Sequence, residues 1–397
     1  MMNRIIFHID VNSAFLSWEA VERLKNGEST DLRKIPSAIG GDPQKRHGII
    51  LAASTSAKKY GVKTGESLYH AFKKCPPLLI AKPNHKLYYE YSQAMIHFLT
   101  NYSPLLEVYS VDECFLDVTN TPGSNNPYAL ALEIKNAIYN KLGFTVNIGI
   151  SDKKILAKMA SDFEKPNKVH TLYTNEIKSK MWPLPIRNLF MVGKSTEDKL
   201  KRIGIYTIGD LANSNLLAVK NMLKKQGETI YRYSNGMDSS QVEPNNYEDI
   251  KGIGNSTTIA YDIDNKFEAY RILLSLTENV SMRLRIKKYK CRLICVEIKN
   301  SDFKKYTHQN KLLSQTDCTD TIYNIAKKLF DESWMGEPIR YLGIRLSDLT
   351  NDPMVQISMF DDTKEDKKNK LDHVLDGLKI HYGQDIITRA SLLDYNK

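Results

Sequence analysis

Cysteine is scarce in this chain, and long hydrophobic runs are absent. The cysteines are Cys75, Cys114, Cys291, Cys295 and Cys318. Because they are odd in number, scattered and contain no Cys-x-x-Cys pair, they argue against a disulfide scaffold or a zinc site and predict free thiols. No apolar run approaches the length that a bilayer span needs, and the start of the chain lacks the form of a secretory signal. We therefore expect a soluble, cytoplasmic protein.

Acidic residues are the minority among the charged ones. The chain of 397 residues has 56 Lys and Arg against 46 Asp and Glu, a formal net charge of +10. Basic surface attracts phosphate backbones and releases their counterions, so the excess indicates a polyanionic partner, with a membrane surface as the competing interpretation. The length is too great for one core and predicts two to four domains.

Strands and helices alternate along the first 172 residues. The pattern predicts strands over 4–10, 49–53 and 144–150 and helices over 14–25, 86–103 and 127–141. This alternation is typical of an α/β sandwich. Short helices are expected beyond Pro183, followed by a polar linker over 235–255 and a second, strongly basic strand-helix-strand region up to Leu349. After a loop and a charged run, the apolar residues from Leu371 to Leu378 have helical spacing.

Two apolar segments a hundred residues apart end in carboxylates, Asp10 in one and Asp112 and Glu113 in the other. Successive side chains of a straight strand point to opposite faces, so the last two carboxylates can converge only at a turn. We therefore predict a hairpin whose tip carries Ser110 to Glu113, with Asp10 aimed at the same point from a neighbouring strand. Clustered carboxylates repel one another and predict divalent metal ions. Taken singly, the same residues could be turn residues and a helix N-cap.

The surroundings of these carboxylates resemble the motifs of Y-family translesion DNA polymerases, more on the UmuC side of that family than on the DinB side. The first motif corresponds to Asp10-Val11-Asn12-Ser13-Ala14-Phe15 and the second to Ser110-Val111-Asp112-Glu113. The resemblance covers nearly the whole chain. It implies a multidomain α/β fold: a right-hand polymerase with a ferredoxin-like palm, small fingers, a helical helix-hairpin-helix thumb and an α/β little finger.

The resemblance also implies domain boundaries. These are a palm over 1–12 and 83–172, fingers over 13–82, a thumb over 173–240, a linker over 241–255, a little finger over 256–350 and a tail over 351–397.

By the same resemblance, Asp10, Asp112 and Glu113 are the catalytic carboxylates and hold two Mg²⁺ ions together with the backbone carbonyl of Val11. Phe15 falls at the steric gate, where an aromatic ring held against C2′ of the incoming sugar rejects ribonucleotides. The residues between the metal ligands and the gate are expected at the nucleotide: Asn12, Ser13 and Ala14.

Cationic side chains must hold the triphosphate of the incoming nucleotide. The family's contacts, often a tyrosine and an arginine, fall on Thr55 and Lys58, and a third falls on Lys165 in the Lys165-Pro166-Asn167 signature. Lys58 offers a point charge where arginine would offer a two-pronged fork, so nucleotide affinity is expected to be lower or differently tuned.

Two regions are expected to hold DNA. Phe190 to Leu200 resembles a helix-hairpin-helix in which Gly193, Lys194 and Ser195 contact phosphate through backbone N–H groups, although Met191 stands where a first glycine is expected. A plain helical pair is the alternative. A basic stripe in the little finger should track the DNA backbone without reading sequence. It comprises Arg283, Arg285, Lys287, Lys288, Lys290 and Arg292, with Lys299, Lys304 and Lys305 soon after.

The tail contains a pentapeptide that resembles the motif by which bacterial polymerases engage the sliding clamp. It consists of Gln356, Ile357, Ser358, Met359 and Phe360. Tethering to a clamp raises the local concentration of DNA ends without new contacts to them. The UmuC resemblance further suggests an activating partner, and we expect a monomer without membrane contacts.

We therefore expect a template-directed DNA polymerase that adds deoxynucleotides to a primer 3′-OH by two-metal catalysis and acts in low-fidelity translesion synthesis and repair. The damage tolerance follows from the resemblance alone. A nucleotidyl cyclase, which positions two metals on a similar core, is one alternative. It would need neither Phe15 nor a basic C-terminal domain. The other alternative is a catalytically silent, clamp-bound DNA-binding protein.

Overall fold

The computed structural model describes residues 4–42, 48–244, 250–351 and 363–396. The chain forms two compact units, Met1–Gly41 with Ile49–Asn246 and Asp42–Gly48 with Tyr247–Lys397. In the described part of the chain, no helix is long and apolar enough to cross a membrane. The cysteines are free thiols, as predicted.

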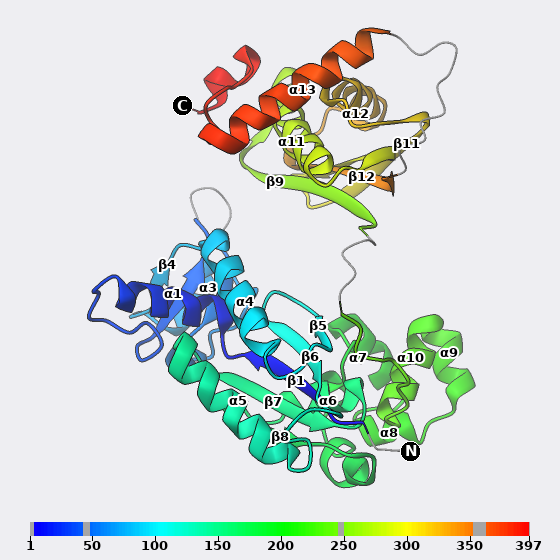
Figure 1. Cartoon of the computed structure of the whole chain (residues 1–397). Coiled ribbons are helices and arrows are strands. Elements are labelled where there is room, and N and C mark those ends of the chain that lie inside the picture. Colours follow the sequence, from blue (N-terminus) through cyan, green and yellow to red (C-terminus); the bar gives the residue numbers. More distant parts are fainter. Residues whose placement is uncertain (1–3, 43–47, 245–249, 352–362, 397) are drawn as a thin grey trace. The chain divides into compact units, whose positions relative to one another are not determined.

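The first unit contains a five-stranded sheet in the order β5-β6-β1-β7-β8. Its strands are β1 (Ile6–Val11), β5 (Leu106–Val108), β6 (Glu113–Asp117), β7 (Val146–Ser151) and β8 (Val169–Thr171). The central strand β1 pairs antiparallel with both β6 and β7. Helices α4 (His85–Leu99) and α5 (Pro127–Leu142) complete a strand-helix-hairpin-helix-strand order (Figure 1). This is the ferredoxin-like arrangement that the resemblance implied for a palm.

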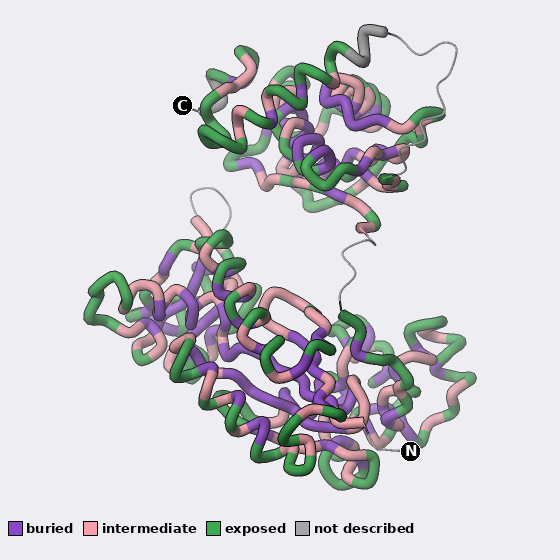
Figure 2. Tube along the Cα trace, viewed as in Figure 1, coloured by how far each residue is buried: buried purple, intermediate pink, exposed green. Residues whose placement is uncertain are grey.

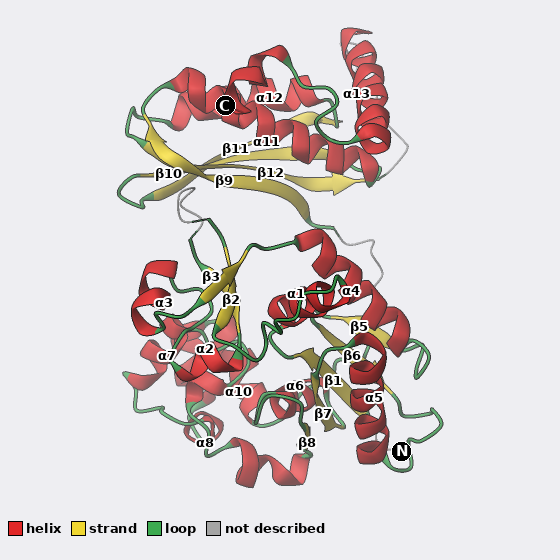
Figure 3. Ribbon diagram, turned by 90° about the vertical axis from the view of Figure 1, so that its left-hand side faces the viewer, coloured by secondary structure: helices red, strands yellow, loops and turns green. Residues whose placement is uncertain are grey.

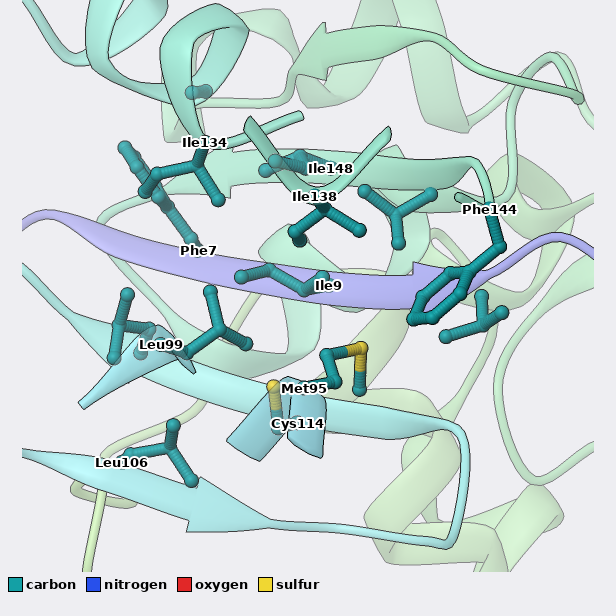
Figure 4. Packing of buried hydrophobic residues seen from close by; sticks show 14 of the residues in the cluster. Phe7, Ile9, Met95, Leu99, Leu106, Cys114, Ile134, Ile138, Phe144 and Ile148 are labelled. Carbon is teal, nitrogen blue, oxygen red and sulfur yellow. The ribbon is translucent and has the colours of Figure 1, made fainter. Parts of the chain in front are cut away.

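The core of this sheet explains which residues of β1 are left for chemistry. Phe7 and Ile9 point to the face where Ile138 of α5 and Met95 of α4 pack against them (Figure 4). Because side chains alternate along a strand, His8 and Asp10 face the other way, toward α6 (Lys154–Ser161). The whole of β1 is buried (Figure 2).

Gly149 of β7 is where α6 comes closest to the sheet. A side-chain carbon there would lie 2.0 Å from the carbonyl oxygen of Ala157, so only glycine fits. The close approach brings α6 directly against the polar face of β1.

The segment between β1 and α4 forms a small second sheet with helices. Its strands β2 (Ser37–Gly40), β3 (Ile50–Ala53) and β4 (Leu79–Ala81) have the order β3-β2-β4. Its helices are α1 (Ala14–Lys25), α2 (Thr55–Lys59) and α3 (Leu68–Lys74). The bounds of α1 are those predicted from the sequence.

Short helices follow β8, as predicted. They are η2 (Thr174–Glu176), η3 (Ile177–Met181), η4 (Ile186–Asn188), α7 (Lys194–Lys201), α8 (Ile208–Ala212), α9 (Leu216–Leu223) and α10 (Lys225–Ser234). Their apolar residues share one core with the outer side of α6, including Leu156 and Met159.

The second unit is a four-stranded antiparallel sheet in the order β11-β10-β12-β9. Its strands are β9 (Gly252–Ile263), β10 (Lys290–Asn300), β11 (Lys305–Thr316) and β12 (Ile339–Thr350). Helices α11 (Lys266–Ile286) and α12 (Thr319–Ser333) cover one face (Figure 3). The edge strand β9 begins inside the predicted linker, because Gly252 to Asn255 pair with β12 despite their polar, glycine-rich sequence.

Helix α13 (Thr363–Tyr382) and η5 (Ala390–Asn396) pack on α11 and α12. The predicted helical spacing near residue 371 is confirmed, but the helix turns an acidic side inward. Asp372 and Asp376 are buried, whereas Leu371 and Val374 are 58% and 61% exposed. The apolar spacing therefore identified the helix but not the face that packs.

Candidate active site

The hairpin predicted from the paired carboxylates is present. Tyr109 and Ser110 both donate their backbone N–H to the carbonyl oxygen of Glu113, each at 3.0 Å, which closes the turn between β5 and β6. At its tip, the Ser110 hydroxyl donates to Asp112 Oδ1 at 2.6 Å. Glu113 is the first residue of β6 and lies directly opposite Asp10 of β1. The turn therefore brings the second motif beside the first.

Basic side chains lie on two of these carboxylates. Lys165 Nζ donates to Asp10 Oδ2 and lies 2.8 Å from Asp162 Oδ1. Glu113 Oε2 is bound by Lys158 Nζ and lies 3.2 Å from Nε2 of His8. In the described part of the chain, no three His, Cys, Asp or Glu side chains are arranged to hold a metal ion. Lys165 and Lys158 neutralise Asp10 and Glu113, which relieves the repulsion between these two carboxylates.

The two carboxylates differ in their electrostatics. The pKa of Asp10 is raised to about 6, because the effect of burial exceeds the opposite effect of the neighbouring Lys165 ammonium. Burial alone would also raise the pKa of Glu113, but hydrogen bonds from His8 and Lys158 lower it to about 2. His8 is buried, which lowers its pKa, and its Nδ1 lies 2.8 Å from the hydroxyl of Ser161. Glu113 is consequently the more strongly stabilised anion.

A cavity of about 650 Å³ opens beside Asp10 and Asp112. All seven residues predicted to bind nucleotide line it: Asn12, Ser13, Ala14, Phe15, Thr55, Lys58 and Lys165. Val11 lines it as well, whereas Glu113 is not among the lining residues. Residues separated by more than 150 positions in the sequence therefore surround one space.

The ring of Phe15 is held in place by helix α4. It stacks on Tyr88 with ring centroids 4.6 Å apart and planes 10° from parallel, and it meets the edge of His85 at 6.0 Å. Sequence reasoning missed both partners, because nothing in their local pattern links them to a residue 70 or more positions earlier.

Asn12 connects the first motif to the loop that carries Lys165. Its amide nitrogen donates to Asn147 Oδ1 at 3.1 Å, and its Oδ1 accepts the backbone N–H of Asn167 at 2.8 Å. Asn12 therefore fixes the position of the loop around Lys165 as well as lining the cavity. Lys158 and His8 were also missed, since neither belongs to a recognisable motif.

The hairpin before α7 keeps its geometry without the first glycine. Met191 has a φ of 69°, in the left-handed region that glycine favours, and its side chain is exposed. Gly193 precedes the helix, and Lys194 and Ser195 form its first turn, whose N–H groups have no intrahelical acceptor. The Lys194 ammonium lies 2.8 Å from Asp198 Oδ1.

The prediction that Arg285 contacts DNA is wrong. Its guanidinium is buried between α11 and α13, where it donates to Asp376 at 2.6 and 3.0 Å and to Asp372 at 3.2 Å. It also donates to the carbonyl oxygen of Asp317 at 2.7 Å. A guanidinium that is buried and paired with two carboxylates is not accessible to a phosphate.

The remaining basic residues of the predicted stripe lie at the end of α11 and on β10. Arg283, Lys287 and Lys288 are exposed, and Lys290 and Arg292 are partly exposed. Arg345, which lies outside the predicted stripe, is an exposed residue of β12 opposite Cys295 of β10. Along β10, buried residues that face α11 and α12 alternate with partly exposed residues. The partly exposed residues point to the opposite face of the sheet, which these helices leave uncovered. The clamp-like pentapeptide, residues 356–360, lies outside the described residues.

Comparisons with known families cover most of the chain. Residues 9–162 match the impB/mucB/samB family, residues 250–359 match the C-terminal domain of that family, and residues 187–238 match the thumb domain of DNA polymerase iota. The DNA polymerase IV of Clostridium acetobutylicum is 49% identical over 394 residues, which are 99% of each chain. The DNA polymerase IV of Acetivibrio thermocellus is 37% identical over 397 residues, covering 99% of this chain and 98% of its own.

Solved structures share the fold. A Y-family polymerase chimera, Dbh-Dpo4(243-245)-Dbh, matches 88% of this chain and 100% of its own with a TM-score of 0.76 at 22% identity. An insertion ternary complex of Dbh DNA polymerase has the same coverage and identity and a TM-score of 0.60. Both relatives are named DNA polymerase IV, so they support the Y family but not the predicted placement on its UmuC side. The chain belongs to the Y family of DNA polymerases.

Proposed function

We propose that this chain adds deoxynucleotides to a primer 3′-OH with two Mg²⁺ ions held by Asp10, Asp112, Glu113 and the carbonyl oxygen of Val11. The observation that carries the proposal is the cavity of about 650 Å³, which Asp10, Asp112, Phe15, Lys58 and Lys165 line together. Membership of the Y family makes the chain a DNA-directed DNA polymerase of the translesion type. A cyclase or a catalytically silent DNA-binding protein has no comparable support.

The donor set suits a hard divalent ion. All four donors are oxygens, which Mg²⁺ prefers, and pairing of β1 with β6 places Asp10 opposite Glu113. Lysine ammonium groups already lie on these two carboxylates, so the site accommodates positive charge beside each of them. Bound Mg²⁺ would supply Lewis-acid stabilisation of the charge that develops at the reacting phosphate.

The remaining residues of the cavity would bind and orient the nucleotide. Lys58 and Lys165 supply cationic donors for the triphosphate, and Thr55 supplies a hydroxyl. Phe15, stacked on Tyr88, presents a fixed ring to the sugar and leaves no room for a 2′-hydroxyl. The ring cannot move away without losing its stacking on Tyr88. A ribonucleotide would therefore be rejected by a steric clash, and this rejection requires no attractive contact to the deoxynucleotide.

Two surfaces would hold primer and template. The first turn of α7 offers the backbone N–H groups of Lys194 and Ser195 to a phosphate, and a helix N-terminus favours negative charge. In the second unit, Arg345 and the stripe residues on β10 and at the end of α11 would contact the DNA backbone. These contacts would give salt-dependent binding without sequence preference.

Template-directed incorporation tests the polymerase proposal. Purified chain is mixed with a labelled primer on four templates that differ only in the first template base, with one deoxynucleotide at a time and with Mg²⁺. We expect extension chiefly by the complementary nucleotide, and none after chelation of Mg²⁺. Extension that ignores the template base, or formation of a cyclic nucleotide from triphosphate alone, would contradict the proposal.

We further propose that residues 356–360 bind a bacterial sliding clamp in the cytoplasm. The support is the resemblance of the pentapeptide, which contributes apolar anchors and a glutamine donor. Addition of clamp should lengthen the products of wild-type chain, whereas a variant with alanine at Met359 and Phe360 should make equally short products with and without clamp. An equal clamp response from both chains would remove the proposal.

A further inference from the structure

Lys58 differs from Lys165 and Lys158 because, among the residues that the structure describes, no carboxylate forms an ion pair with it. Lys165 and Lys158 each lie on an anionic oxygen, whereas Lys58 Nζ donates to the hydroxyl oxygen of Ser13 at 2.9 Å. The Ser13 hydroxyl in turn donates its only hydrogen to the carbonyl oxygen of Ala53 at 3.0 Å. The two hydrogen bonds are compatible, because a hydroxyl can donate its one hydrogen and still accept a hydrogen bond from an ammonium group.

The backbone of Ser13 is unusual for a residue with a side chain. Its φ of 48° and ψ of 52° lie in the left-handed region, which costs a residue with a Cβ free energy that glycine would not pay. Ser13 is also the N-cap residue of α1, yet its hydroxyl caps no N–H of that helix. The hydroxyl instead reaches β3 and α2, which carry Ala53 and Lys58. The Ser13 hydroxyl therefore forms hydrogen bonds at the cavity instead of capping α1.

Burial, the charge of Lys165 and the flexibility of its own side chain all act against a fixed position of the Lys58 ammonium. Burial lowers its pKa and the positive charge of Lys165 lowers it further, while the Asp10 carboxylate opposes these effects only in part. A lysine side chain also has several rotatable bonds, and each conformation lost on binding reduces affinity. The Ser13 hydroxyl gives the Lys58 ammonium one fixed acceptor on the wall that both residues line.

We propose that Ser13 is a positioning residue that holds the Lys58 ammonium in place for the triphosphate of the incoming nucleotide. The inference rests on the proposed function, because it assigns a triphosphate to this cavity. Ser13 would also compensate for the lysine at a position where the family often has arginine. A lysine that is held before the nucleotide arrives loses less conformational freedom when it binds.

Two variants of Ser13 separate the hydroxyl from the backbone. Ser13→Ala removes the hydroxyl and keeps the left-handed strain, whereas Ser13→Gly removes the hydroxyl and relieves the strain. In steady-state incorporation on primer-template, both should raise KM for the deoxynucleotide roughly 3- to 10-fold with kcat nearly unchanged, as expected for one hydrogen bond and one ordered side chain. Equilibrium binding of the nucleotide to the primer-template complex should weaken by the same factor.

Lys58→Ala, and its combination with Ser13→Ala, complete the cycle. Lys58→Ala should raise KM more than either Ser13 variant, and adding Ser13→Ala to it should change KM no further, because the hydroxyl then has no ammonium to hold. Lys59→Ala is the matched control: Lys59 is the next residue of α2, is exposed and does not line the cavity.

The outcomes distinguish the inference from the proposed function. If Lys58→Ala raises KM while both Ser13 variants match wild type, Ser13 does not position Lys58. The same conclusion follows if the Ser13 and Lys58 effects multiply in the double variant, or if Ser13→Gly restores wild-type KM. If no chain, wild type included, incorporates nucleotide, the proposed function fails instead.

Discussion

The two units use basic side chains in different ways. In the first unit, three lysines around the site have fixed acceptors: Lys165 lies on Asp10, Lys158 on Glu113 and Lys58 on Ser13. In the second unit, most of the basic side chains at the end of α11 and on the open sheet face are exposed to solvent. The first arrangement defines positions for a small charged substrate. The exposed basic side chains of the second unit supply diffuse positive charge, which suits a DNA backbone that slides along the protein.

Arg285 and Arg345 show that the difference does not follow from sequence position. Arg285 stands inside the basic run and is buried against Asp372 and Asp376, more than 80 residues later. Arg345 stands outside that run and is exposed on β12. A basic residue is available to DNA only if no distant carboxylate pairs with it, which the local sequence does not reveal.

Removal of the buried guanidinium should give the largest effect and would test whether Arg285 is structural. Arg285→Ala leaves Asp372 and Asp376 buried without a partner, so we expect a loss of about 3–5 kcal/mol of stability in the second unit. Hydrogen exchange of the α11 and α13 amides in the full chain measures it. The neighbouring variant Arg283→Ala should leave exchange unchanged. If Arg285→Ala exchanges like wild type and instead weakens DNA binding, Arg285 contacts DNA and does not stabilise the fold.

The held ring of Phe15 gives a second test in the first unit. Phe15→Ala should reduce discrimination against ribonucleotides by roughly 100-fold, the scale of rejection that a pocket achieves against one added hydroxyl, with deoxynucleotide incorporation largely retained. The measurement is the ratio of kcat/KM for matched deoxy- and ribonucleotides. Phe98→Ala, on the far end of α4, serves as the aromatic control because Phe98 does not line the cavity. Unchanged discrimination in Phe15→Ala would show that the gate lies elsewhere.

Substitution of Lys165 tests whether a lysine with a fixed acceptor binds the triphosphate. Lys165→Ala should raise KM for the deoxynucleotide roughly tenfold or more, since it removes a charged hydrogen-bond donor from the cavity. Lys168→Ala is the control, because Lys168 is exposed and lies 3.7 Å from Glu164 rather than in the cavity. A KM equal to that of the control would place the triphosphate away from Lys165.

Exposed basic residues of the second unit should have the smallest individual effects. Arg345→Ala should lower the slope of log affinity against log salt for primer-template by about 0.9, the change expected for one lost phosphate contact on a duplex. Lys305→Ala should lower it less, because the Lys305 ammonium already lies 2.8 Å from Glu297. Equal slopes in wild type and Arg345→Ala would remove Arg345 from the DNA surface.

Much of the fold follows from local patterns in the sequence. The apolar spacing of α1 predicted its bounds, and the alternation of strand side chains required the turn that Ser110 to Glu113 provide. Both are short-range consequences of backbone geometry. The inward acidic side of α13 could not be predicted, because Asp372 and Asp376 pair with Arg285, which lies more than 80 residues earlier in the sequence.

The site was predicted to a similar extent. Asp10 to Phe15 of the first motif and Asp112 of the second line one cavity, whereas Glu113 does not. What holds them in place was not visible: Tyr88 behind Phe15, Lys158 on Glu113, and Asn147 on Asn12. Each of these contacts joins segments far apart in the chain. The sequence motif identifies the residues at the site, and tertiary packing decides how firmly they are positioned.

The central claim is that the carboxylates at the β5–β6 turn carry out nucleotide addition. Single-turnover extension of a bound primer by Asp112→Asn, compared with wild type, tests it most directly, with Asp117→Asn at the other end of β6 as the control. We predict that Asp112→Asn loses on the order of 10³-fold in rate, because metal-ion catalysis contributes several kcal/mol, while primer-template binding is retained. Extension by Asp112→Asn at the rate of Asp117→Asn would contradict the account.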